Sequence, residues 1–228
     1  MIDKVKDMKE ALSCIKSGDE IMIGGFTHSG CPLGLLRMLA KMPVDNLTMI
    51  SEDIGYANAD FYKERAVSEL LDDRKIAKVR VSFIGANSKA NALISEGKLD
   101  YELIPQGTLA ERIRAGGSGI GGFYTPTGVG TIVEEGKEKK VINGKEYLLE
   151  LPLRANVALI KAYKADHMGN AVFKYTAKNF NPLMAMAADI TILEAEEIVE
   201  TGDIDPEDVE LPGVFVNYVV QTKGEGWQ

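Results

Sequence analysis

Histidine and cysteine are scarce in this sequence of 228 residues, which has two of each. Cys14 and Cys31 are far apart, and with His28 and His167 they form no cluster with the spacing of metal ligands. The pattern therefore predicts neither a disulfide framework nor a zinc site. We expect no metal and no tightly bound cofactor.

A basic field and a long apolar run are also missing. The formal net charge is -8 at pH 7, and no cluster of lysine and arginine stands out. Such a chain has little to neutralise a run of phosphates, so we expect no nucleic-acid partner. No apolar run approaches the length of a membrane span, and residues 1–7 are charged. These features predict a cytoplasmic protein outside the membrane.

The composition that is present suits an ordinary globular core. Hydrophobic residues make up 45% of the chain and charged residues 26%. We see no internal repeat and no low-complexity linker, so we expect one domain over residues 1–228.

Helical and strand patterns alternate along the chain. Apolar spacing and turn residues predict helices at 5–15, 32–39, 62–71, before Gly97, 109–114 and 182–188, and strands at 21–23, 47–51, 79–84, 101–104, 157–165, 171–175, 190–193 and 214–220. This alternation predicts an α/β fold with an open, mostly parallel sheet and helices on both faces. Asn143-Gly144 within Lys140–Glu150 predicts a type I′ hairpin, which we expect to form a small antiparallel flap.

Two local patterns lead to further predictions, one for the ends of a helix and one for the exposure of an acidic run. Thr108 with Glu111 three residues later has the form of a capping box, for a helix that stops at Gly116-Gly117. The acidic run Glu194 to Glu200 is interpreted as a solvated face.

A glycine-rich segment, residues 24–32, lies between a predicted buried strand and the next helix. At the carboxyl end of a strand in an open α/β sheet, glycines let backbone N–H groups approach an anion or a thioester oxygen. No Gly-Lys-Ser/Thr follows, which excludes a Walker loop. A tight turn with helix-packing glycines remains at least as good an interpretation from the residues alone.

A second glycine-rich stretch covers residues 116–131. It contains a formal G-x-G-x-x-G from Gly117 to Gly122, but it follows a helix rather than a strand, so we reject a dinucleotide fingerprint. Interleaved apolar residues favour an ordered loop that lines a cleft over a flexible surface loop.

No G-x-S-x-G elbow or Cys/His pair supplies a nucleophile with its base, and His28 is best interpreted as a hydrogen-bonded or solvated loop residue.

Longer motifs resemble the family I coenzyme A transferases. The stretches that carry the resemblance are Ser17 to Phe26 with Gly30 and Pro32, Pro105 to Gly117, Tyr124 to Thr131, Pro152 to Ala155, Ala158 to Ala162, and Asn179 to Pro182. They cover nearly the whole chain in order. The sequence is most similar to A (alpha) subunits, notably those of acetate or butyrate:acetoacetate CoA-transferases.

The resemblance implies a function shared between two subunits. In this family a glutamate attacks the acyl-CoA thioester, forms a glutamyl-CoA thioester through a mixed anhydride, and passes CoA to an incoming carboxylate. That glutamate lies in a Glu-Asn-Gly or Glu-Ser-Gly motif of the B subunit, and neither tripeptide occurs in this chain. We therefore expect a B (beta) partner, an A2B2 heterotetramer, and acyl-CoA and carboxylate substrates.

The resemblance also implies site residues. Gln106 would hydrogen-bond the substrate oxygen near the thioester, with helix capping as the alternative role. The expected pocket and loop residues are Gly24, Gly25, Phe26, Gly30, Gly116, Gly117, Gly119 and Gly128.

One departure from the family pattern follows the strand at 47–51. Relatives commonly have Asn-Asn or Asn-Asp where this chain has Glu52-Asp53, and two carboxylates in the pocket would repel an anion or raise one another's pKa.

Two other functions remain as alternatives: a sugar-phosphate isomerase, which needs an in-chain base, and a ligand-sensing module, which needs an appended DNA-binding segment.

Overall fold

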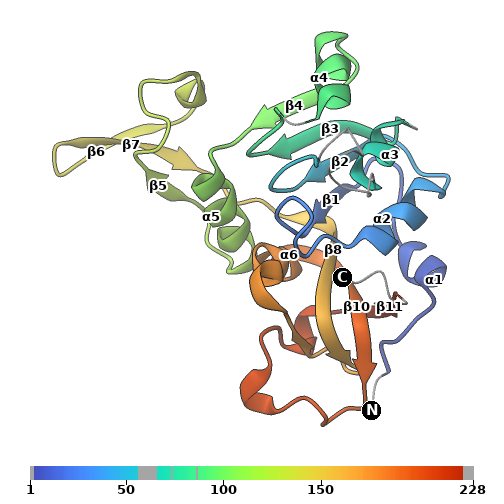
Figure 1. Cartoon of the computed structure of the whole chain (residues 1–228). Coiled ribbons are helices and arrows are strands. Elements are labelled where there is room, and N and C mark those ends of the chain that lie inside the picture. The colour runs from blue at the N-terminus through green and yellow to red at the C-terminus, as the bar shows by residue number, and fades with distance from the viewer. Residues whose placement is uncertain (1–2, 56–65, 73, 86, 223–228) are drawn as a thin grey trace.

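The chain is built around an eight-stranded sheet (Figure 1). The computed structural model describes residues 3–55, 66–72, 74–85 and 87–222. In spatial order the strands are β11 (Tyr218–Gln221), β10 (Ala188–Val199), β8 (Ala155–Asp166), β1 (Glu20–Ile23), β2 (Leu47–Ile50), β3 (Ile76–Val81) and β4 (Asp100–Leu103). All these neighbours pair in parallel, and the short β9 (Ala171–Val172) pairs antiparallel with β8.

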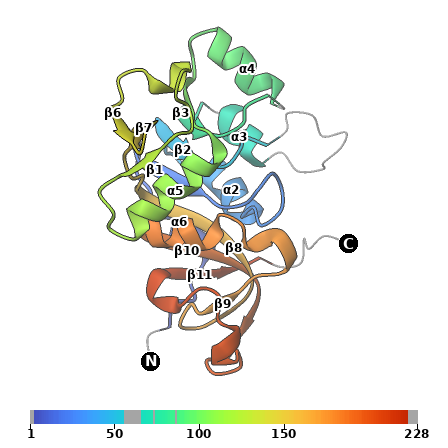
Figure 2. The same ribbon diagram turned by 90° about the vertical axis from the view of Figure 1, so that its left-hand side faces the viewer.

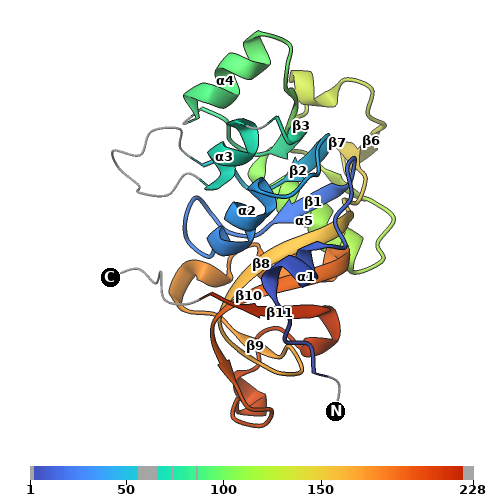
Figure 3. The same cartoon turned by 90° about the vertical axis from the view of Figure 1, so that its right-hand side faces the viewer.

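Helices cover both faces of this sheet. One face carries α1 (Met8–Leu12), α2 (Leu33–Ala40), α3 (Ala66–Asp72) and α4 (Ser88–Ser95), and the other carries α5 (Gln106–Gly117) and α6 (Asn181–Ala187). Figure 2 views the molecule from the side of α5 and α6, and Figure 3 from the side of α1 and α2. Along β1, Ile21 and Ile23 pack into the first core while Met22 packs into the second, as the alternation of a strand requires. The predicted fold class is confirmed.

A separate antiparallel sheet extends beyond α5 (Figure 1). Its strands are β5 (Phe123–Thr125), β7 (Lys145–Glu150) and β6 (Lys139–Ile142), in that spatial order. Asn143 and Gly144, between β6 and β7, have φ values of 50° and 77°. Two consecutive positive φ values are what a type I′ turn needs, so the predicted hairpin flap is confirmed.

Helix α5 differs from its prediction at its start. It begins at Gln106 with Pro105 at the N-cap and no side-chain capping bond. The predicted capping box is wrong, because Thr108 is buried inside the first turn and Glu111 pairs with Arg114 instead.

Near its end, α5 continues through the glycines that were predicted to stop it. A Cβ added at Gly116 would lie 1.9 Å from the carbonyl oxygen of Leu153, and one at Gly117 would lie 2.8 Å from the Met186 Cβ. These glycines let α5 pack closely against its neighbours, and the helix ends immediately afterwards, at Ser118.

Strand β10 is longer than predicted and changes the interpretation of the acidic run. Glu194 lies within it with 2% of its surface exposed, so the predicted solvated face is wrong at this position. Its carboxylate Oε2 accepts a hydrogen bond of 2.9 Å from the backbone N–H of Leu35 in the first turn of α2. That helix has Pro32 at its N-cap and no side-chain cap of its own, so Glu194 satisfies one of its unpaired donors.

Other boundaries shift by a few residues. The strand predicted at 79–84 is β3, at Ile76–Val81, and the last strand, β11, follows a 3₁₀ turn at Gly213–Phe215. The first residues of the helix predicted at 62–71 lie outside the described residues. Among the described helices, none is long and apolar enough to cross a membrane.

The order of the strands sets the position of the site. From β1 the chain moves outward through β2, β3 and β4, and then returns to place β8, β10 and β11 on the other side of β1. The direction of winding therefore reverses between β1 and β8. The carboxyl ends of strands at such a switch point are where open α/β sheets bind ligands.

Candidate functional site

The glycine-rich segment predicted from the sequence follows β1 at this switch point. The backbone N–H of Gly24 donates to the Leu159 carbonyl of β8 at 2.9 Å. Phe26 and Ser29 then exchange two backbone hydrogen bonds of 3.0 and 3.1 Å, which close a tight loop ahead of α2. The loop is ordered by its own backbone and stands at the carboxyl edge of the sheet.

Asn181, at the start of α6, fastens this loop to the rest of the molecule. Its side chain is fully buried. Oδ1 accepts from the backbone N–H of Lys161 at 3.0 Å, while Nδ2 donates to the carbonyls of Gly30 at 3.0 Å and Ala177 at 2.8 Å. One amide thus joins the loop, β8 and the turn before α6. The motif around Asn181 carried part of the family resemblance, but this role was not predicted from it.

Glu52 and Asp53 lie directly after β2 and beneath the loop, with 4% and 9% of their surfaces exposed. Asp53 accepts from the backbone N–H of Thr27 at 2.8 Å and of Gly55 at 2.7 Å. Burial, followed by the neighbouring Glu52 carboxyl, raises the pKa of Asp53 to about 6. Through its hydrogen bonds to the backbone of Thr27 and Gly55, Asp53 holds the loop in place.

The Glu52 carboxyl, which neighbours that of Asp53, also reaches the start of α5. Its Oε1 accepts from Ser82 Oγ at 2.7 Å and from Gln106 Nε2 at 2.8 Å. Gln106 itself is exposed at the first position of α5, so its amide is held by Glu52 while still reaching solvent. Capping of α5 is not its role, since that helix has no side-chain capping bond.

A slot of about 340 Å³ joins two of the predicted site residues. Its lining consists of Phe26, Gln106, Gly107, Ala110, Asn179, Phe180 and Leu183. The structure thus brings Phe26 of the glycine loop together with Gln106 of α5, from segments that are 80 residues apart in sequence.

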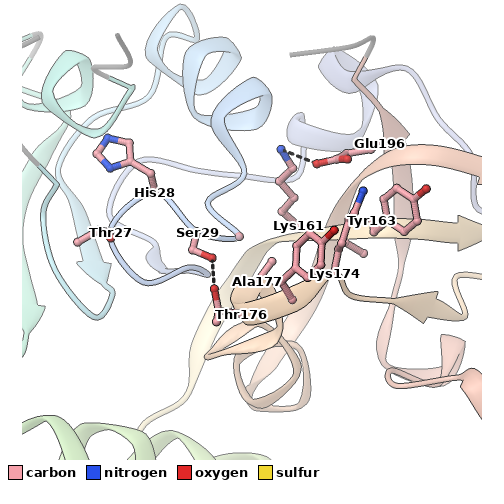
Figure 4. A pocket seen from close by; sticks show the side chains of 12 residues that line it. Thr27, His28, Ser29, Lys161, Tyr163, Lys174, Thr176, Ala177 and Glu196 are labelled. Atoms are coloured by element: carbon pink, nitrogen blue, oxygen red, sulfur yellow. Dashed lines mark hydrogen bonds and ion pairs between the residues drawn. The ribbon is translucent and has the colours of Figure 1, made fainter. Parts of the chain in front are cut away.

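A second cleft, of about 490 Å³, is lined by residues 27–30 of the loop together with residues of β8 and the turn before α6 (Figure 4). Lys161 pairs with Glu196 at 3.4 Å in its wall, and Ser29 Oγ lies 3.0 Å from Thr176 Oγ1. Lys174 Nζ lies 4.6 Å from the centre of the Tyr163 ring, a distance typical of a cation–π contact. These lysines were not predicted as site residues, because nothing in their spacing signals that β8 and the turn before α6 meet.

The second group of predicted glycines lies elsewhere. Gly116 and Gly117 belong to α5, and Gly119 and Gly128 occupy turns with φ values of 70° and 92°. None of these four lines either of the two clefts. Among the described residues, no three His, Cys, Asp or Glu side chains are grouped so that they could hold a metal ion.

Comparison with known proteins fits this arrangement of a glycine loop and Gln106 at the switch point. Residues 5–222 match the family described as coenzyme A transferase. The chain belongs to this family. The resemblance seen in the sequence is therefore confirmed.

Several relatives of this coenzyme A transferase chain are A, or alpha, subunits. It is 47% identical over 212 residues to the A subunit of a probable succinyl-CoA:3-ketoacid coenzyme A transferase of Bacillus subtilis, covering 93% of this chain and 87% of the relative. It is 46% identical over 221 residues to the alpha subunit of the acetoacetyl-CoA:acetate/butyrate CoA transferase of Clostridium acetobutylicum, covering 97% and 99%. The alpha subunit of the acetate CoA-transferase of Escherichia coli is 41% identical over 220 residues, covering 96% and 97%.

Solved coenzyme A transferases share the fold. The acyl-CoA transferase of Escherichia coli O157:H7, in its thioester complex with CoA, superposes with a TM-score of 0.84 at 22% identity, over 96% of this chain and 47% of that one. This chain thus corresponds to about half of that protein. Glutaconate coenzyme A-transferase of Acidaminococcus fermentans gives a TM-score of 0.82 at 21% identity, over 96% and 76%.

Proposed function

We propose that this chain is the A subunit of a CoA-transferase that moves CoA between a short-chain acyl-CoA and a carboxylic acid such as acetate, butyrate or acetoacetate. The observation that carries the proposal is the joint placement of Phe26 and Gln106 at the switch point, in a chain related at 41–47% identity to proteins named as A or alpha subunits. The sugar-phosphate isomerase alternative has no support from the comparisons.

The chemistry needs a carboxylate nucleophile, which we place on a B subunit within an A2B2 assembly. One carboxylate oxygen of that glutamate attacks the thioester carbonyl, and CoA leaves as thiolate to give a mixed anhydride. The thiolate then attacks the glutamyl carbonyl and releases the first acid, which leaves a glutamyl-CoA thioester. An incoming carboxylate reverses both steps and takes CoA away.

This chain contributes to binding and positioning. Gln106 Nε2 carries a second N–H besides the one given to Glu52, and this amide would donate to the oxygen on which negative charge develops. Phe26 would form part of the wall of the slot and Gly30 part of the second cleft, while Gly24 and Gly25, which line neither, would shape the pocket through the path of the loop. Gly116, Gly117, Gly119 and Gly128 would contribute through the packing and turns of their segment, since they line neither cleft.

The cytoplasm is the compartment that we propose for this enzyme. Cys14 and Cys31 are both thiols and form no disulfide, which suits a reducing compartment.

The division of labour can be tested with the chain alone and with a co-expressed B subunit that carries Glu-Asn-Gly or Glu-Ser-Gly. We expect activity only from the mixture. Treating the complex with acyl-CoA and then borohydride reduces the enzyme thioester, and peptide mapping should find the reduced glutamate on the partner. A label on a glutamate of this chain, or full activity of the chain alone, would overturn the proposal.

A further inference from the structure

The slot beside Gln106 has a lining almost without polar groups. Phe26, Ala110, Phe180 and Leu183 contribute apolar side chains from the glycine loop, α5 and the start of α6. About 340 Å³ is near the lower end of the range for small-molecule sites, which suits a small group.

The amide of Asn179, which also lines the slot, uses both its N–H groups and its oxygen in hydrogen bonds to the backbone. Its Nδ2 donates to the carbonyls of Ser29 at 2.9 Å and Thr176 at 2.8 Å, and its Oδ1 accepts from the N–H of Phe180 at 2.7 Å. Within the part of the chain that the structure describes, no cationic side chain lines the slot. A carboxylate entering it would lose its hydration and find no positive partner among these lining residues.

Glu52 does not line the slot, but it contacts the lining residue Gln106 and carries the wrong charge for such a guest. The buried Glu52 carboxylate lies 2.8 Å from Gln106 Nε2, directly behind the amide that lines the slot. Because the slot is apolar and Glu52 is buried, their surroundings have a lower dielectric constant than water, so two negative charges there repel each other more strongly. Glu52 therefore adds a repulsive term for any second carboxylate on the substrate.

We infer that this slot receives the acyl group and that Glu52, acting behind Gln106, selects acyl groups without a terminal charge. The inference rests on the proposed function and narrows its substrate class to monocarboxylic acids and their CoA thioesters. It does not follow from the names of the relatives, which include enzymes for succinyl-CoA and 3-oxoadipate as well as for acetate and butyrate.

The second cleft offers the contrasting environment within the same chain. Lys161 and Lys174 line it together with residues 27–30, whereas Gln106 does not line it. A dicarboxylic substrate whose distal carboxylate reached Lys174 would be favoured by that cleft. An acyl group bound in the slot predicts a preference for acyl-CoA donors without a terminal charge. An acyl group bound in the second cleft predicts a preference for dicarboxylic donors.

The test is donor selectivity of the complex with its B subunit, measured as kcat/KM for acetyl-CoA, butyryl-CoA and succinyl-CoA with a fixed acceptor. We expect the ratio of kcat/KM for butyryl-CoA to kcat/KM for succinyl-CoA to be roughly ten or more. Glu52→Gln keeps an oxygen that can accept from Gln106 but removes the charge, and it should narrow that ratio roughly tenfold, chiefly through a lower KM for succinyl-CoA. Leu183→Lys places a cation in the slot and should narrow it as well.

The matched control is Glu10→Gln, which removes a carboxylate from the exposed surface of α1 and should leave the ratio unchanged. An active complex that uses succinyl-CoA as well as butyryl-CoA, or one in which Lys174→Gln alone lowers the use of succinyl-CoA, would overturn this inference and leave the proposed function standing. A complex inactive with all three donors would overturn the proposed function and the inference together.

Discussion

Gly24 and Asn181 approach each other so closely that no side chain fits between them. A Cβ added at Gly24 would lie 1.9 Å from Asn181 Oδ1, well inside any van der Waals contact. Asn181 has no room to move away, because it is fully buried and its amide joins the loop, β8 and the turn before α6. Position 24 must therefore be glycine if the loop is to pack against Asn181.

Gly24→Ala should destabilise the protein and impair the site. The added methyl group must displace Asn181 or the loop, which should cost about 1–3 kcal/mol of unfolding free energy, the usual range for overpacking. Urea unfolding gives this quantity, and the transferase assay with the B subunit gives the loss of activity.

Gly121→Ala is the matched control for this substitution. A Cβ at Gly121 would meet nothing within 4 Å, and its φ lies outside the left-handed region. The control should change the unfolding free energy by less than about 0.5 kcal/mol. Equal effects of the two substitutions would contradict the role given to the contact with Asn181.

Glu194→Ala should destabilise the chain although this residue belongs to an acidic run. The substitution removes the acceptor for the Leu35 N–H at the start of α2, and loss of such a cap costs about 0.5–2 kcal/mol. Glu197→Ala on the same strand is the control, because the Glu197 side chain is 47% exposed and pairs with Lys164 at the surface. A chemical unfolding curve for Glu197→Ala as displaced as that for Glu194→Ala would show that burial of Glu194 is irrelevant.

The features that were predicted correctly from the sequence are those set by neighbours in the chain. Alternating helical and strand patterns predicted the parallel sheet, and Asn143-Gly144 predicted its turn, because both depend on a few consecutive residues. The loop after β1 was placed correctly for the same reason. That Phe26 of this loop and Gln106 belong to one site was expected only through family resemblance.

The features that were missed depend on residues far apart in sequence. Glu194 is 159 positions from its partner Leu35, and Asn181 is 151 positions from Gly30. An acidic run looks solvated until the strand that contains it is known to pass a helix N-terminus. Likewise, no local pattern indicates that the amide of Asn181 is buried and shared among three segments.

Asp53 should make stability depend on pH in the acidic range. Its pKa rises from 3.8 to about 6 on folding, so between these values the native state binds more protons than the unfolded state. Its contribution is therefore favourable at low pH and is lost as pH rises through about 6. Asp53→Asn removes this dependence, so the melting temperature of the variant minus that of the wild type should increase between pH 4 and pH 7. Melting curves at several pH values measure it, and a constant difference would mean that Asp53 titrates normally in the folded chain.

Gln106→Ala in the assembled enzyme should lower turnover roughly ten- to a thousandfold, the scale for losing one donor to a developing oxyanion. The fold and the assembly should survive, because Gln106 is exposed, caps no helix, and leaves Glu52 bonded to Ser82 when its amide is removed. Gln221→Ala, at an exposed position of β11, is the control for removal of a glutamine and should leave turnover unchanged. Steady-state kinetics with butyryl-CoA, alongside gel filtration of the complex, separates catalysis from assembly. If turnover of Gln106→Ala equals that of the wild type while the complex remains intact, Gln106 does not touch the reacting oxygen, and the bond to Glu52 serves only to hold the start of α5.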